Sequence, residues 1–152
     1  MSGIEWTFVT SEITIPANRP TTMLQIQTPS SHHAVNLKEY TYTFDGASGA
    51  LEGIYCRLLR QTTTGSMTGA TPQHAIDGRR ETIQSSLGII ATSGGEPGVG
   101  VAYKAWAINP QAGYEYTSPY REEVHIAGGN KCGFEFTAPN TVNVVIAIKV
   151  DE

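Results

Sequence analysis

Apolar and polar residues alternate with a period of two along most of this chain. The alternation is longest near the end of the sequence, where one apolar face is formed by Val142, Val144, Ile146, Ile148 and Val150. Successive side chains of a strand point to opposite faces, so this pattern predicts a strand with one face in a core. The 3.6-residue period of an amphipathic helix is nearly absent, and we therefore expect an all-β protein.

Similar runs predict nine or ten short strands along the chain. They cover residues 4–8, 13–15, 24–27, 40–44, 54–59, 87–91, 101–108, 123–126, 132–136 and 142–150. Their spacing of about 8–15 residues is typical of a β-sandwich or barrel. Gly128–Gly129–Asn130 predicts a hairpin turn between the eighth and ninth runs. We expect one domain over residues 1–152, because nothing resembles a linker or an internal repeat.

The middle of the chain has a different character. Residues 61–84 are rich in Thr, Gly and Ser, and a loop of this length inside a domain is often functional. We expect a long surface loop that becomes ordered against a partner, the alternative being a loop without a role. Residues 78–86 could form a short helix or remain part of this loop.

Charge argues against nucleic acid as a partner, and the lack of a long apolar run argues against a membrane span. Charged residues make up 16% of the chain, against about 25% in a typical globular protein, and the net charge is −4. The basic residues are scattered, so we expect no direct contact with nucleic acid. No apolar run approaches the length of about 18 residues that a membrane span needs. The first residues do not resemble a signal peptide, so we expect synthesis in the cytoplasm.

The sequence offers no convincing catalytic or metal site. His32 and His33 are adjacent and would point to opposite faces of a strand, while His74 and His125 have no ligand-type neighbours at a suitable spacing. The glycine-rich segment 94–100 lacks the Lys-Ser/Thr ending and the following helix of a phosphate-binding loop. We therefore expect no catalytic residues, no metal, no cofactor and no enzymatic activity.

Cys56 and Cys132 share the parity of apolar neighbours in their strands. Free cysteines are among the residues most often buried, so two reduced, buried thiols are expected. A disulfide between two packed strands is the alternative.

The residues expected at a contact surface fall into three groups. Tyr114, Tyr116 and Tyr120 lie in a segment with Gly113 and Pro119, which predicts irregular backbone over 111–121. Exposed tyrosines are enriched at protein interfaces and could also stack on a sugar. The alternative is that these rings close the open end of a sandwich. The other two groups are the segment around Trp6 and the loop 62–74, which carries Thr64, Met67 and His74.

The layout of the whole chain resembles that of small jelly-roll proteins of tailed bacteriophages, which act as capsid cement or decoration proteins. The likeness is carried by Thr22–Ile26, by Gly53–Arg60 leading into Gly65–Pro72, by Glu96–Pro97, by Arg121–Gly129 and by the closing apolar strand.

The resemblance implies a jelly-roll-like antiparallel β-sandwich of about 8–10 strands. It also implies a homotrimer on the capsid surface of a virion, where it binds the major capsid protein and braces the shell. The low charge is compatible with this function, since interface cores are depleted in charged residues. A carbohydrate-binding β-sandwich module is the alternative function.

Overall fold

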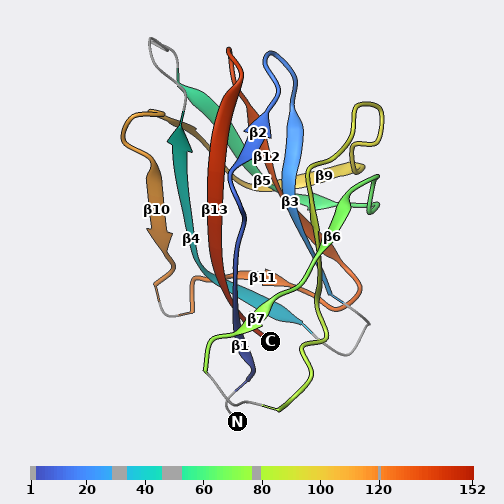
Figure 1. Cartoon of the computed structure of the whole chain (residues 1–152). Helices are drawn as coiled ribbons and strands as arrows, with labels where there is room; N and C mark the ends of the chain where they lie inside the picture. Colours follow the sequence, from blue (N-terminus) through green and yellow to red (C-terminus); the bar gives the residue numbers. More distant parts are fainter. Residues whose placement is uncertain (1–2, 29–33, 46–52, 77–79, 120) are drawn as a thin grey trace.

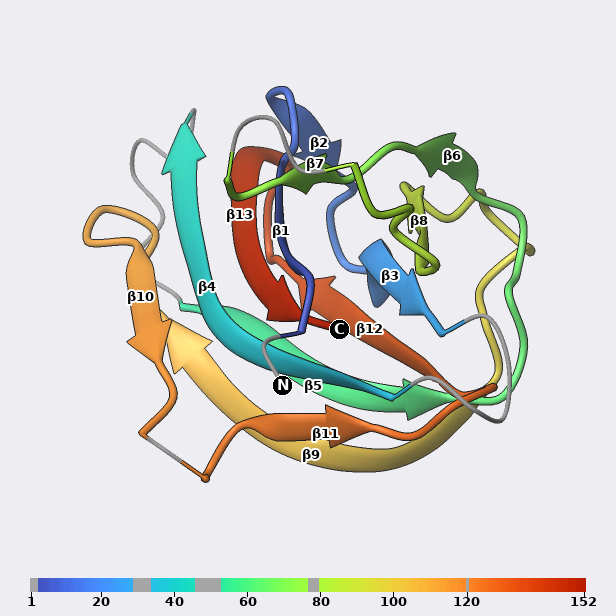
Figure 2. The same ribbon diagram turned by 90° about the horizontal axis from the view of Figure 1, so that it is seen from below.

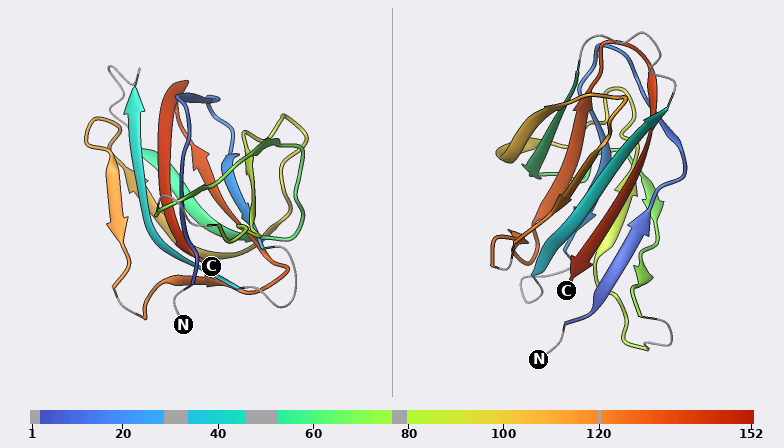
Figure 3. Two further views of the ribbon diagram at one scale, coloured as in Figure 1. Left: turned by 60° about the horizontal axis from the view of Figure 1, so that its bottom comes forward. Right: turned by 90° about the vertical axis from the view of Figure 1, so that its left-hand side faces the viewer.

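Two β-sheets packed face to face make up the fold (Figure 1). The computed structural model describes residues 3–28, 34–45, 53–76, 80–119 and 121–152. Within these ranges the chain forms thirteen strands and no helix, and the named strands pair antiparallel. The two layers are seen from the side in Figure 3. The all-β prediction is therefore confirmed.

One layer is a seven-stranded sheet. Its strands are β1 (Glu5–Val9), β2 (Ile13–Ile15), β4 (Val35–Asp45), β7 (Gln73–His74), β10 (Tyr114–Thr117), β11 (Val124–Ile126) and β13 (Val142–Asp151). The main order is β10–β4–β13–β1–β7, with β11 paired to β4 and β2 paired to β13.

The other layer is a six-stranded sheet. Its strands are β3 (Thr21–Gln27), β5 (Ile54–Gln61), β6 (Thr68–Ala70), β8 (Ser86–Ile89), β9 (Val99–Ile108) and β12 (Lys131–Thr137). Their order is β6–β8–β3–β12–β5–β9.

Eight of these strands form a jelly roll. The central orders β1–β13–β4–β10 and β3–β12–β5–β9 place four strands in each layer. The chain passes between the layers in the sequence that two interlocked Greek keys require (Figure 2). The jelly-roll prediction is confirmed, and the additional strands extend its edges.

The core lies between the two sheets, where the alternating residues meet. Residues of β13 are buried and half-buried in strict alternation, which confirms its predicted apolar face. The largest fully buried side chains include Trp6, Tyr40, Tyr42, Phe134 and Phe136. Removing a large apolar side chain from water contributes about 1.5–3 kcal/mol, so these rings are main contributors to stability.

The described part of the predicted loop 61–84, residues 61–76 and 80–84, is more ordered than the sequence suggested. Gln61 still belongs to β5, and residues 62–66 bond to the loop before β9, for example through Ser66 N–H to Gly95 O at 2.7 Å. Strand β6 then pairs with β8, and β7 pairs with β1 in the other sheet. Residues 62–76, which we call the crossing segment, thus run from one sheet to the other (Figure 2). The chain's own backbone supplies the partners of these strands.

Two local predictions were wrong, and one open alternative is decided. The described part of 78–86 contains no helix, so the loop alternative holds there up to Ser86, which begins β8. Residues 127–130 make a turn, but the strands on either side, β11 and β12, belong to different sheets and form no hairpin. The segment predicted to be irregular contains β10, since Tyr114 and Tyr116 continue a period-two pattern across from β4.

Candidate interaction surface

Stacked aromatic rings close one side of the sandwich. Tyr40 and Tyr42 on β4 lie directly opposite Tyr116 and Tyr114 on β10. Trp106 on β9 comes from the other sheet, and its ring centroid lies 5.2 Å from that of Tyr114. Tyr40 and Tyr116 are also 5.2 Å apart. These five rings, which we call the aromatic stack, therefore join the edge strands of the two sheets.

Lys104 completes this side of the molecule. It lies opposite Leu58 on the inward face of β9, and its Nζ sits 3.7 Å from the centroid of the Tyr116 ring. An ammonium over an aromatic face is attracted by the ring quadrupole. The one charged residue of β9 is thus directed to the gap between the sheets.

The predicted aromatic residues do not come together as an exposed platform within the described structure. Tyr114 and Tyr116 are half-buried, and their rings stack on other rings. Trp6 is fully buried, and its Nε1–H donates to the Glu152 carboxylate at 3.2 Å. Trp6 is therefore a core residue of the isolated chain. Tyr120 lies outside the described residues.

The other predicted contact residues lie on the opposite side of the sandwich, along the crossing segment. Thr64 is exposed, whereas Met67 is half-buried over Gly88, where a Cβ would lie 3.1 Å from Met67 Cβ. His74 pairs with Trp6 through the backbone, and its Nδ1 is buried without a hydrogen-bond partner. The structure therefore separates Thr64, Met67 and His74 from Tyr114 and Tyr116.

Among the described residues, the segment with the most exposed apolar side chains was not among the contact residues predicted from the sequence. Residues 99–103 of β9, with the sequence Val-Gly-Val-Ala-Tyr, are all exposed, and Val99 and Val101 are 52% and 71% accessible. Strand β9 is the last strand of its sheet, and β5 is the one strand that pairs with it in the described structure. Soluble proteins usually protect such edges with charge, and residues 99–103 carry none. We call this segment the exposed part of β9.

The backbone of the exposed part of β9 is irregular. Its register with β5 shifts twice, once on each side of Leu59. Gly100 lies so close to β5 that a Cβ there would be 2.8 Å from the carbonyl oxygen of Arg60. A bulge leaves its extra residue outside the ladder and bends the strand. The apolar side chains of this segment therefore emerge at the edge of the sheet.

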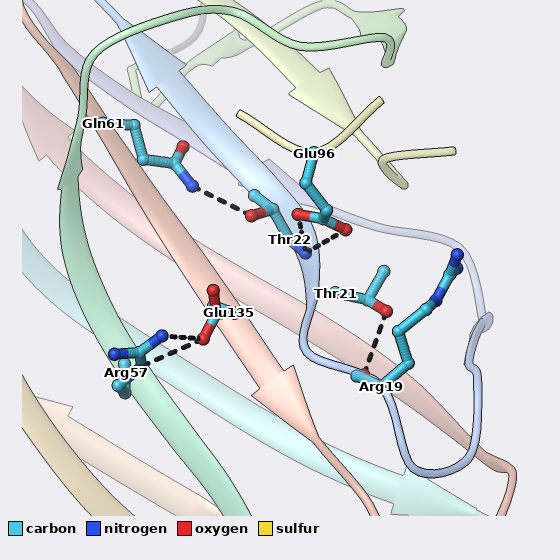
Figure 4. Close-up of polar contacts among 7 residues, drawn as sticks. All are labelled: Arg19, Thr21, Thr22, Arg57, Gln61, Glu96 and Glu135. Atoms are coloured by element: carbon cyan, nitrogen blue, oxygen red, sulfur yellow. Dashed lines mark hydrogen bonds and ion pairs between the residues drawn. The ribbon is translucent and has the colours of Figure 1, made fainter. Parts of the chain in front are cut away.

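Several polar side chains on the outer face of the six-stranded sheet are paired with one another (Figure 4). Arg57 donates to Glu135 Oε1 from Nε at 2.9 Å and from Nη2 at 2.6 Å. The Glu96 carboxylate accepts the backbone N–H of Thr22 at 3.0 Å. It takes the place of a ladder partner there, because β8 ends at Ile89. Gln61 donates to the Thr22 hydroxyl at 2.9 Å. These carboxylates have structural roles in the sheet.

Both cysteines are free, buried residues of the six-stranded sheet. Cys56 lies opposite Phe136 and Cys132 lies opposite Arg60, so four residues separate the two positions along β12. That offset is roughly 13 Å, beyond the Cα separation that a disulfide spans. Burial raises the pKa of each thiol well above its usual value. The prediction of reduced, buried thiols is confirmed.

We expect both thiols to be inert in the folded protein. The reactive species is the thiolate, which burial disfavours in both cysteines. An aromatic disulfide reagent at pH 8 should therefore release almost no chromophore from the native chain and two equivalents in strong denaturant. Rapid release from the native protein would contradict the buried positions of Cys56 and Cys132.

The described residues show no candidate metal site. Among the described residues, no group of three or more His, Cys, Asp or Glu side chains is arranged to hold a metal ion. The same residues form no helix long and apolar enough to cross a membrane. No protein-family model matches the chain, and no curated protein sequence matches it significantly.

Proposed function

We propose that this chain is a capsid accessory protein of a virus, a cement protein that binds the outer surface of the shell and stabilises it. On this proposal the chain acts by binding alone, and the major capsid protein is its partner on the virion. The resemblance to phage cement proteins supports the proposal, and so does the jelly-roll order of the sheets, an architecture that viral capsid proteins and lectins share.

The observation that carries an assembly function is the exposed part of β9. A free edge strand with uncharged apolar side chains tends to attract other chains, and natural proteins avoid it unless it becomes covered. Here Val99, Val101 and Tyr103 are exposed on such an edge. We infer that this surface is covered in the working assembly.

The rigidity of the two sheets is compatible with a protein that stabilises a shell. Antiparallel ladders and backbone bonds in the crossing segment fix both layers, so the surface presented to a shell is preorganised. A shell repeats its binding sites many times, and linked copies gain avidity from contacts that are individually weak. A small interface per copy is therefore sufficient for this function.

Co-sedimentation of the chain with virus particles tests this proposal. Virus particles made by cells that carry the gene are banded on a density gradient, and fractions are assayed for the chain and for the major capsid protein. We expect the chain to band with the shells in a fixed ratio and shells stripped of it to break at a lower temperature. Adding back the purified chain should restore the stability. A chain that stays at the top of the gradient would sink the proposal.

The carbohydrate-binding alternative has less support from the geometry. Stacking on a sugar needs an open ring face, and the rings of Tyr114 and Tyr116 stack on Tyr42 and Tyr40. The alternative remains a prediction. Binding to a glycan panel that is abolished by replacing both tyrosines with alanine would favour it.

A further inference from the structure

We propose that two copies of the chain associate edge to edge through Val99–Tyr103 of β9, with Val101 close to a two-fold axis. The starting point is the free edge of β9, a strand of ten residues that pairs with β5 and with no other strand of the described structure. Each side chain from Val99 to Tyr103 is exposed, although three of these residues are Val or Tyr. This surface is distinct from the aromatic stack, whose rings are turned toward one another.

The charge distribution favours a second copy of the chain as the partner of the exposed part of β9. The chain carries a net charge of −4, so two copies repel each other overall and associate most readily through a surface without charge. The exposed part of β9 has no charge, and Lys104, the next residue, is held over Tyr116. Arg60 of β5 lies beside Gly100, but residues 99–103 themselves offer no charge to a partner. A partner with the same uncharged apolar strand fits it, and β9 itself is such a strand.

The antiparallel arrangement makes the contact self-complementary. A two-fold axis at Val101, the midpoint of the exposed part of β9, places Val101 against its equivalent and Val99 near Tyr103 of the second copy. Such an isologous contact uses the same patch on both copies and closes on itself. It also gives partners to the backbone groups on the free edge of β9, which point away from β5.

The size of the patch sets the expected strength. The exposed area of the three large side chains is roughly 300 Å² per copy, less than the roughly 800 Å² that a standard interface buries on each partner. We therefore expect a concentration-dependent monomer–dimer equilibrium in the micromolar range or weaker. Copies held side by side on a surface would pair more readily than copies free in solution.

The first experiment is sedimentation equilibrium over a wide concentration range. We expect a mass that rises from 16.4 kDa toward twice that value. Val101→Glu should weaken dimerisation at least tenfold, because it places two carboxylates against each other at an apolar axis. Val9→Glu is the matched control, since Val9 is 61% exposed on β1 of the other sheet, and it should leave the equilibrium unchanged. Circular dichroism would establish that both variants are folded.

The second experiment locates the axis. Val101→Cys should form an intermolecular disulfide under mild oxidation, whereas Val9→Cys should not. The native thiols do not interfere, since Cys56 and Cys132 are buried. A trimer, a monomer at every concentration, or equal cross-linking of the two variants would overturn the inference.

Failure of the pair and failure of the proposed function have different signatures. If shells bind the monomeric Val101→Glu variant, the cement function stands, and pairing of copies through β9 is not needed for it. If the wild-type chain dimerises but never bands with shells, the pair stands and the cement function falls. The resemblance implies a trimer, so the measured mass also decides between the two oligomeric states.

Discussion

Replacing Phe134 by alanine is expected to lower the free energy of unfolding by about 3–5 kcal/mol. Phe134 is fully buried on β12, near the middle of the six-stranded sheet. Its ring centroid lies 5.6 Å from that of Tyr40 and 5.7 Å from that of Tyr42, so truncation leaves a cavity beneath both tyrosines. The total stability of a domain is typically about 5–15 kcal/mol, and this loss would be a large part of it.

Urea unfolding would measure the effect, with Tyr55→Ala as the control. Tyr55 lies on the neighbouring strand β5, but its side chain points to the outer face and is 45% exposed. We expect this second variant to lose no more than about 1 kcal/mol, as surface substitutions generally do. Equal midpoint shifts for the two variants would show that Phe134 is not held in a packed core.

Replacing Arg57 by leucine is expected to cost about 2–3 kcal/mol, because it leaves the carboxylate of Glu135 buried without its cation. The side chain of Glu135 is 6% exposed, and its Oε1 accepts two hydrogen bonds from Arg57. Loss of one partner of a fully buried pair costs about 3–5 kcal/mol. The Arg57 side chain is 31% exposed, so water near the pair lowers this figure.

The double variant Arg57→Leu/Glu135→Leu should recover most of the loss. Two apolar side chains in register on neighbouring strands remove the stranded charge and pack against each other. Unfolding midpoints of Arg57→Leu, Glu135→Leu and the double variant would test whether the double variant is more stable than Arg57→Leu. A double variant as unstable as Arg57→Leu would mean that the charge of Glu135 is not the source of the cost.

The sequence predicted the elements whose pattern is local. The apolar face of β13 follows directly from alternation, and the same pattern at Trp6 agrees with its burial. The jelly-roll architecture came from the resemblance in layout. Free thiols at Cys56 and Cys132 followed from their parity with apolar neighbours.

What the sequence could not predict depends on pairing between distant strands. The residues of β9 show a strand, but nothing in them shows that β5 would be its one neighbour. The turn at 127–130 looks like a hairpin, and only the pairing of β11 with β4 shows that the chain changes sheets there. β10 was hidden because Gly113 and Pro119 flank a strand of four residues.

The two sides of the sandwich also differ in the length of free strand edge that they offer to another chain. On the side of the crossing segment the terminal strands β6 and β7 have three and two residues, which offer little template to another chain. On the other side β9 offers ten. A contact between two β9 strands uses the long edge of both copies, so growth through these edges ends at a pair rather than in an open fibre. By ending both sheets in such short strands, the crossing segment protects the chain from polymerising.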